Sequence, residues 1–259
     1  MTGLKPNDNI TIDSLRIRIP TNKITNLDNE LNQEIFKFNG ETGEILNPDN
    51  PNIPLTKYIQ HNGIKIGFGI KSLLSGKAIS EEYLTVEIHS KQLKENYFTG
   101  LTPTNIKDAY NYIMSLNVVK FSFEDFINSS CSDVDFKKDI LLTQEQYRNL
   151  IDKIKEIARP YKEKNKGYHE YNRKYNQGIE WTDRRYSKMT YPYLKIYNKY
   201  KELTRISEFI NTYLPEINIK SLIDLETNLF RVEFQIKNTA HFNRYGITDI
   251  SLKNILNLE

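Results

Sequence analysis

Tyrosines, lysines and carboxylates alternate with apolar residues in three segments of this chain. The segments are 133–140 (DVDFKKDI), 191–199 (YPYLKIYNK) and 228–237 (NLFRVEFQIK). Successive side chains of a strand point to opposite faces, so each segment, if extended, buries its apolar residues and presents its polar ones. If the three strands share a sheet, its open face gathers Asp135, Lys195, Tyr197, Lys199 and Glu233. A wet face of mixed charge is also common on antiparallel sheets, and this plainer interpretation stays open.

A face of this composition suits the cleavage of a phosphodiester. Asp135 and Glu233 are candidate ligands of a hard divalent cation, Mg²⁺ or Mn²⁺, because carboxylate oxygens bind such ions. A bound cation would polarise the scissile phosphate and neutralise developing charge. A tyrosine hydroxyl is a weak nucleophile at its ordinary pKa of about 10, and nearby cations make its phenolate more accessible. Tyr197 has Lys195 and Lys199 on its own face and is therefore the candidate nucleophile.

The positive charge of the chain is concentrated in residues 161–200. The net charge is +3 over 259 residues, yet this segment alone holds ten Lys and Arg against four Asp and Glu, and nine of the 17 tyrosines. Cations contact phosphates and aromatic rings stack on unpaired bases, so the segment predicts contact with nucleic acid. The candidate DNA-binding residues are Arg173, Lys174, Arg184, Arg185 and Lys195, with Tyr168 and Tyr175 as candidate stacking residues. The alternative is a solvated loop rich in Lys and Tyr.

Other catalytic templates are missing from the sequence. It has no glycine-rich phosphate loop and no GxSxG motif, and its four histidines form no HExxH or His-x-His pair. The single cysteine, Cys131, excludes an intrachain disulfide. No apolar run reaches about 18 residues, and the N-terminal residues lack the apolar region of a signal peptide. We therefore expect a cytoplasmic protein that does not contact a membrane.

Strand and helix patterns alternate along the chain without a regular βαβ rhythm. Strands are expected at 12–19, 64–70, 83–89, 133–140 and 228–237, and hairpins at 35–46 and 178–199. Thr143 and Gln146 form a capping-box pattern at the start of a helix that is expected to end at Pro160. These elements predict an α+β fold, an antiparallel sheet with a charged active face and helices packed on the other face. Residues 1–259 form a single domain in this prediction, or two related lobes at about 10–158 and 178–259, joined by the basic, tyrosine-rich segment 159–177.

Several stretches of the chain, taken in order, resemble the gene II/X replication-initiator family of filamentous phages. They are IDSLRIRIP, NGIKIGFGI with LTVEIHSKQLKENYF, CSDVDF, IEWTDRRYSKMTYPYLKIYNKYKEL and NLFRVEFQIKN, spread over about residues 10–247. The phrase IYNKYKE also resembles the initiators of staphylococcal-type rolling-circle plasmids. One position departs from the phage pattern, since Asp133 stands where the family has an arginine.

The resemblance implies a rolling-circle initiator, an endonuclease that nicks one strand of a double-stranded origin. Such an enzyme stays joined to the 5′ phosphate through a tyrosine, leaves a 3′-OH as primer, and later rejoins the displaced strand as a circle. Matching motif by motif places that tyrosine at Tyr197, followed by Lys199 and Glu202, and the acidic strand positions at Asp135 and Glu233. The implied partners are the double-stranded origin, the nicked single strand, and a host helicase and polymerase.

Three alternatives stay open at this point. An alignment shifted by four residues makes Tyr193 the nucleophile, because Tyr193 begins a similar Tyr-Leu-Lys and lies on the same face. A non-catalytic module would use the basic segment to hold DNA without cutting it. A tyrosine transposase or relaxase would use the same chemistry for a different product, and the lack of paired histidines counts against a relaxase.

Overall fold

The computed structural model describes most of the chain, with gaps. The described residues are 9–27, 37–38, 45–46, 58–61, 64–70, 82–163, 168–171, 178–181, 193–203, 227–237 and 239–258. The Cα positions divide the chain into two compact units. Unit 1 consists of residues 1–14, 93–102 and 132–248, and unit 2 of residues 15–92, 103–131 and 249–259. This division differs from the predicted lobes at about 10–158 and 178–259, because the strand that contains residues 132–143 pairs with the strand 227–236.

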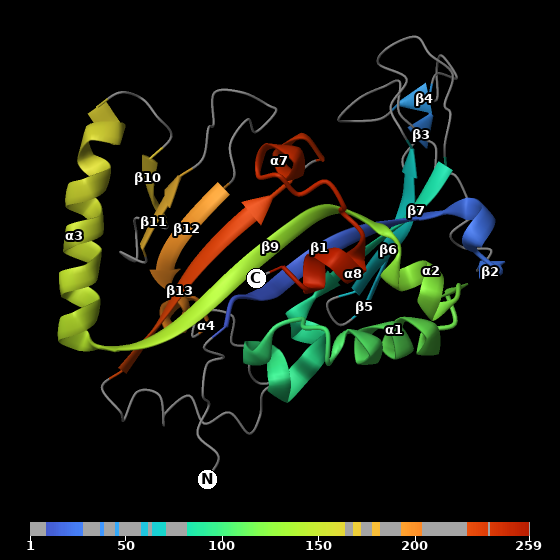
Figure 1. Cartoon of the computed structure of the whole chain (residues 1–259), viewed down its shortest axis with the longest axis horizontal. Helices are drawn as coiled ribbons and strands as arrows, with labels where there is room; N and C mark the ends of the chain where they lie inside the picture. Colours follow the sequence, from blue (N-terminus) through green and yellow to red (C-terminus); the bar gives the residue numbers. More distant parts are fainter. Residues whose placement is uncertain are drawn as a thin grey trace. The chain divides into compact units, whose positions relative to one another are not determined.

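An antiparallel sheet forms the centre of unit 1 (Figure 1). Its strands lie in the order β10 (Tyr168–Tyr171), β11 (Gly178–Trp181), β12 (Tyr193–Asn198), β13 (Thr227–Ile236) and β9 (Ser130–Thr143). Helices α3 (Gln144–Glu163), α4 (Lys199–Leu203) and α7 (Thr239–Arg244) belong to the same unit, as does the 3₁₀ segment η2 (Ser90–Thr99) from residue 93 onward. The predicted α+β class, the antiparallel sheet and the hairpin within 178–199 are confirmed.

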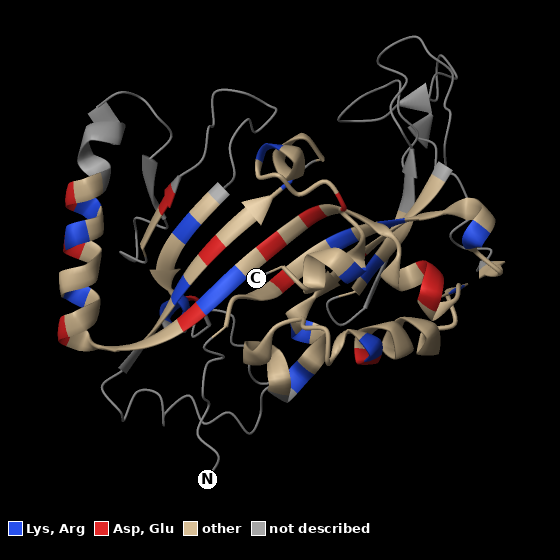
Figure 2. Ribbon diagram, in the orientation of Figure 1, with Lys and Arg blue, Asp and Glu red and all other residues tan. Residues whose placement is uncertain are grey.

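The three alternating segments are neighbours in this sheet. Lys195, Glu233 and Lys137 form one row across β12, β13 and β9, and Tyr197, Arg231 and Asp139 form the adjacent row. Because side chains alternate along each strand, both rows lie on the same face. Figure 2 shows the resulting bands of acidic and basic residues along these strands. The period-two pattern therefore predicted correctly that Asp135, Lys195, Tyr197 and Glu233 share a face. Lys199, predicted on the same strand face, lies beyond the strand as the first residue of α4.

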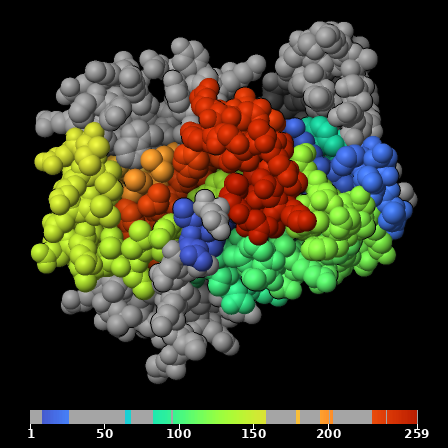
Figure 3. Space-filling model, in the orientation of Figure 1, coloured from blue at the N-terminus to red at the C-terminus, as the bar shows by residue number. Residues whose placement is uncertain are grey.

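Helix α3 packs against the opposite, apolar face of the same sheet. The rings of Tyr147 in α3 and Phe230 in β13 meet edge to face, with centroids 6.1 Å apart. Phe230 precedes Arg231 in its strand, so its ring points away from the charged row. In Figure 3 the yellow surface of α3 borders the orange surface of the neighbouring strands. Helix α3 thus covers part of the apolar face. Phe234, on the same face, meets the ring of Tyr245 after α7, with centroids 5.7 Å apart.

The start of α3 is the predicted capping box. The backbone N–H of Thr143 donates to Gln146 Oε1 at 2.9 Å, and the N–H of Gln146 donates to Thr143 Oγ1 at 3.2 Å. The predicted end of this helix at Pro160 is wrong, because α3 continues to Glu163. A proline removes one backbone donor, and the residues after it keep helical geometry here.

Unit 2 contains the N-terminal strands and, within the residues described, three further α-helices. The elements are β1 (Thr11–Pro20, of which residues 11–14 belong to unit 1), η1 (Thr21–Lys23), β2 (Asn26–Leu27), β3 (Lys37–Phe38), β4 (Ile45–Leu46), β5 (Tyr58–His61), β6 (Ile64–Ile70), β7 (Glu82–His89), α1 (Ile106–Ser115), β8 (Val119–Lys120), α2 (Phe123–Ile127) and α8 (Leu252–Leu256). Strands β7, β6 and β5 pair antiparallel in that order, and β3 pairs with β4, as the sequence predicted for 64–70, 83–89 and 35–46. In the parts of the chain with defined positions, no helix is long and apolar enough to cross a membrane.

Candidate active site

Tyr197, Lys199 and Glu202 come together where β12 turns into α4. The Lys199 ammonium donates to the Tyr197 hydroxyl at 3.4 Å and to Glu202 Oε2 at 2.5 Å. Lys199 is the first residue of α4, and Glu202 lies one helical turn later, so the lysine can reach both partners. Next to them, the N–H of Lys201 donates to Asn198 Oδ1 at 2.9 Å and fixes the first turn. The structure therefore brings together three of the five residues that the resemblance named, Tyr197, Lys199 and Glu202.

This face of the sheet is buried, in contrast to the open face that the sequence predicted. Tyr197 is 1 % exposed and Lys199 is 5 % exposed. Tyr97 of η2, itself 0 % exposed, lies against the same charged side chains, including the Lys199 ammonium. Alternation along a strand predicts two faces, but it does not show whether another segment covers the polar one.

Gly178 of β11 allows a close approach to the backbone of Tyr197. The two residues are partners in the β11–β12 ladder. A Cβ atom at position 178 would lie 2.6 Å from both the Cα and the Cβ of Tyr197, which is closer than real side chains come. Glycine at this position therefore allows the backbone of β11 to pack closely against the backbone of Tyr197.

Burial controls the protonation of the cluster. Desolvation, followed by the charge of Glu233, raises the pKa of Tyr197 well above its ordinary value. Burial alone would lower the pKa of Lys199, but Tyr97, Glu202 and Asp13 together raise it above its ordinary value. At neutral pH the resting cluster thus contains a neutral phenol and a lysine ammonium.

A second set of buried charges surrounds Arg231 and was not singled out as a site from the sequence. Arg231, fully buried, donates from Nε and Nη2 to the two carboxylate oxygens of Asp139 at 2.6 and 2.7 Å. Its Nη1 donates to Asp13 Oδ1 at 3.2 Å. The ammonium of Lys137 lies 3.5 Å from Asp13 Oδ1 and 3.4 Å from Asp139 Oδ2. We call Asp13, Lys137, Asp139 and Arg231 the arginine cluster.

Tyr97 connects the arginine cluster to Lys199. Its hydroxyl accepts a hydrogen bond from Arg231 Nη1 at 3.2 Å, and its carbonyl oxygen accepts one from the Lys137 ammonium at 3.1 Å. The Lys199 ammonium lies 5.7 Å from the centre of its ring. Desolvation is the largest influence on the pKa of this hydroxyl and raises it. Tyr97 lies within LTVEIHSKQLKENYF, one of the stretches quoted for the resemblance, but no role in a site was predicted for it.

Removing one member of the arginine cluster is expected to destabilise unit 1 strongly. In Asp139→Ala the guanidinium of Arg231 stays buried without its bidentate partner, and such a loss costs about 3–5 kcal/mol. Urea unfolding followed by circular dichroism measures this loss of stability.

Burial alone would raise the pKa of Asp139, but Arg231 and Lys137 lower it below its ordinary value. The stability that Asp139 contributes is therefore present above the unfolded pKa of about 3.9 and is lost as pH falls through the lower folded pKa. A variant with unchanged stability would contradict this account.

Asp135 and Glu233 have carboxylate oxygens that fit a divalent cation. Oδ1 of Asp135 and Oε2 of Glu233 are buried and accept no hydrogen bond within the described residues. Asp135 Oδ2 accepts one from Ser14 at 2.7 Å, and the Lys195 ammonium lies 3.4 Å from Glu233 Oε2. Desolvation raises the pKa of Asp135 to about 7, with Asp133 and Glu233 adding to the effect. A cation bound at Asp135 Oδ1 would supply the partner that this oxygen lacks within the described residues.

The two carboxylates would form an incomplete metal site by themselves. Among the residues with described positions, no group of three or more His, Cys, Asp and Glu side chains is placed to hold a metal ion. Mg²⁺ is commonly held by one or two carboxylates together with water and substrate phosphates. The donor set therefore fits an ion that binds together with a phosphate-bearing substrate.

Most of the predicted DNA-binding residues cannot be placed. Arg173, Lys174, Arg184, Arg185 and Tyr175 lie outside the described residues. Lys195 lies on the charged face and pairs with Glu233. Tyr168 and Tyr193 belong to β10 and β12 by their backbones, and their side chains are not described.

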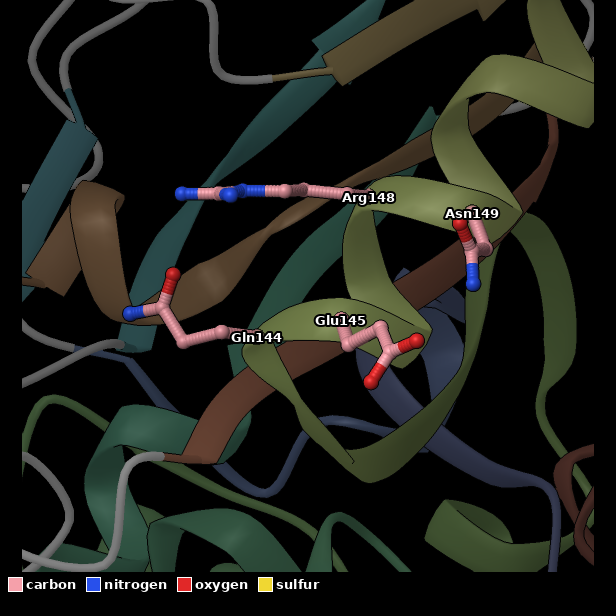
Figure 4. A pocket seen from close by; sticks show the side chains of 4 residues that line it. All are labelled: Gln144, Glu145, Arg148 and Asn149. Atoms are coloured by element: carbon pink, nitrogen blue, oxygen red, sulfur yellow. The ribbon is translucent and has the colours of Figure 1, made fainter.

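A pocket of about 590 Å³ lies at the start of α3 (Figure 4). It is lined by Gln144, Glu145, Arg148 and Asn149. The side chains of Gln144 and Arg148 extend on one side of the helix in this view. Its described lining residues are one acid, one base and two amides from consecutive turns of one helix, and none of these four is a nucleophile. We therefore place the candidate site at Tyr197.

Comparisons with protein-family models, with curated proteins and with solved structures returned no match to this chain.

Proposed function

We propose that this protein is a rolling-circle replication initiator that nicks and rejoins DNA through a 5′-phosphotyrosine at Tyr197. The observation that carries the proposal is the contact of one buried lysine, Lys199, with both the Tyr197 hydroxyl and the Glu202 carboxylate. The enzyme would act in the cytoplasm on the double-stranded origin of a phage or plasmid. A host helicase and polymerase would extend the 3′ end that it produces.

The proposed reaction exchanges one phosphate ester for another. The phenolic oxygen of Tyr197 attacks the scissile phosphorus, a P–O bond to tyrosine forms, and the bond from phosphorus to the 3′ oxygen breaks. The Lys199 ammonium, held by Glu202, donates to the phenolic oxygen and stabilises its developing negative charge, while the phenolic proton passes to water. The departing 3′ oxygen takes a proton from water and becomes a 3′-OH. The reverse reaction rejoins the strand without an external energy source.

Asp135 and Glu233 are the proposed ligands of Mg²⁺ or Mn²⁺. When bound, the ion would polarise the phosphate and neutralise developing charge. The charge of Glu233 raises the pKa of Tyr197, so engaging this carboxylate would also make the phenol easier to ionise.

The test is capture of the covalent adduct. The full chain is incubated with Mg²⁺ or Mn²⁺ and a random-sequence single-stranded oligonucleotide library that carries fluorescein at the 3′ end. A 5′-phosphotyrosine product keeps the 3′ label, so the expected result is a fluorescent protein band on a denaturing gel. Sequencing the captured DNA would identify the cleavage site. The absence of a band with either metal, while DNA binding is retained, would contradict the nuclease proposal.

A non-catalytic DNA-binding module is the second candidate. The near-complete burial of Tyr197, 1 % exposed without DNA, favours it, because a nucleophile must meet its substrate. Such a module would bind the library with a steep salt dependence and would never form the adduct.

Both candidates predict that the basic segment sets the salt dependence of DNA binding. Each phosphate contact contributes about −0.7 to −0.9 to the slope of log K against log salt. Replacing Arg173, Lys174, Arg184 and Arg185 with glutamine is expected to weaken binding and to flatten that slope by roughly 2 to 4 units. Fluorescence anisotropy at several salt concentrations measures both the affinity and this slope.

The matched control removes four exposed lysines elsewhere in the chain. These are Lys107, Lys120, Lys153 and Lys253. The same change in net charge at these positions is expected to leave the slope nearly unchanged. Equal effects in the two variants would mean that general electrostatic attraction, and not contact by the basic segment, governs binding.

A further inference from the structure

We propose that Ser14 is a positioning residue of the candidate metal site, which orients the carboxylate of Asp135 toward a bound Mg²⁺ or Mn²⁺. This inference rests on the proposed function, and it adds a residue to which neither the strand patterns nor the resemblance gives a role. The Ser14 hydroxyl donates to Asp135 Oδ2 at 2.7 Å. The two residues are 121 positions apart in the sequence, so only the folded chain brings them together.

The order of the strands places Asp135 between two neighbouring strands. Strand β9, which carries Asp135, lies between β13 and β1. Gln235 is its partner in the ladder with β13, and Ser14 belongs to β1 on the other side. Residues 1–14 and 132–248 belong to unit 1, so this contact lies within one compact unit. The hydrogen bond therefore holds the carboxylate of a central strand from its β1 side.

The contact with Ser14 uses one carboxylate oxygen and leaves the other for a cation. Oδ2 of Asp135 accepts from Ser14, whereas Oδ1 is buried and accepts no hydrogen bond within the described residues. A hydroxyl that donates to a carboxylate also stabilises its charged form, which is the form that binds a cation. Groups that hydrogen-bond to a metal ligand orient it, and their loss typically weakens metal binding by about 10- to 100-fold.

The alternative is an ordinary hydrogen bond between neighbouring strands. Such a bond would contribute to stability and would leave the affinity for metal unchanged when it is removed. Unit 2 contains a serine–aspartate pair of the same chemistry, in which the Ser122 hydroxyl donates to Asp125 Oδ2 at 2.5 Å. Ser122→Ala is therefore the matched control for the loss of a hydroxyl from an aspartate.

The test measures metal binding directly. The full chain is titrated with Mn²⁺ in the presence of an oligothymidylate, and free Mn²⁺ is followed by electron paramagnetic resonance. Ser14→Ala is expected to weaken Mn²⁺ binding by about 10- to 100-fold, whereas Ser14→Thr, which keeps the hydroxyl, and Ser122→Ala are expected to keep the affinity. If Ser14→Ala fails to fold, Ser14→Thr and Ser14→Val decide, because they have nearly the same shape, suit a strand and differ in the hydroxyl.

Adduct formation gives a second measurement. Ser14→Ala should need about 10- to 100-fold more Mn²⁺ for half of its maximal rate, while the rate at saturating Mn²⁺ stays close to that of the unmodified chain. Equal Mn²⁺ affinity in Ser14→Ala and the unmodified chain would overturn the role of Ser14 and leave the proposed function standing. An unmodified chain that binds no Mn²⁺ would overturn both Ser14 and the metal site, and adduct capture then tests the nuclease separately.

Discussion

Replacing Tyr197 with phenylalanine is expected to abolish DNA nicking and the covalent adduct while DNA binding persists. The variant keeps the ring and its packing and removes only the attacking oxygen. Loss of a catalytic nucleophile lowers rates by about 10⁴-fold or more. The loss of the hydrogen bond from Lys199 costs about 1 kcal/mol, and Lys199 keeps its contact with Glu202. Adduct capture with the labelled library measures the chemistry, and thermal unfolding confirms the fold.

Tyr193→Phe is the matched control, because it tests whether the alignment with the initiator family is shifted by four residues. Tyr193 lies in the same strand, four residues before Tyr197 and opposite Gln235 of β13. The control is expected to keep forming the adduct. If Tyr197→Phe still forms the adduct and Tyr193→Phe does not, the alignment shifted by four residues is the correct one.

Local sequence patterns predicted the strands and the face on which each candidate residue lies. Alternation in three separate segments is sufficient to place Asp135, Tyr197 and Glu233 on one side of a sheet, because side-chain direction in a strand has a fixed period. The Thr143–Gln146 capping box has a comparable local cause, since its two partners are three residues apart. Lys199 and Glu202 are similarly close to Tyr197 in the chain.

The long-range contacts of the site could not be predicted in this way. Arg231 is 218 residues from Asp13 and 134 from Tyr97 in the sequence, and only the folded chain brings them together. Arg231 alternates with the apolar residues of its segment, which predicts a polar face and does not show that this face is buried. Burial under Tyr97 turns Arg231 and Asp139 into a buried ion pair, whose partners must be present together. The burial of this face therefore depends on contacts between segments that are far apart in the sequence, and alternation within one segment does not predict it.

Neutralising the carboxylate pair is expected to remove activity without loss of stability. Asp135→Asn and Glu233→Gln keep the shapes of the side chains and weaken a site for a hard cation. A metal supplies several kcal/mol of transition-state stabilisation, so adduct formation should fall by about 10²-fold or more. The unmodified protein should need Mg²⁺ or Mn²⁺ and lose its activity with a chelator.

The stability of these variants separates a metal site from an ordinary ion pair. Asp135 has a buried oxygen that accepts no hydrogen bond within the described residues, so removing its charge should leave the free energy of unfolding equal or higher. Glu233 pairs with the partly exposed Lys195, and such a pair contributes at most about 1 kcal/mol. A carboxylate that serves only as a partner of Lys195 would instead lose stability and keep its activity per folded molecule. Glu87→Gln, which removes the partner of Arg16 in unit 2, is the matched control and should affect neither adduct formation nor its metal requirement. Undiminished adduct formation in the presence of the chelator would exclude Asp135 and Glu233 as essential metal ligands, and Lys199 and Glu202 would then be the groups left to activate Tyr197.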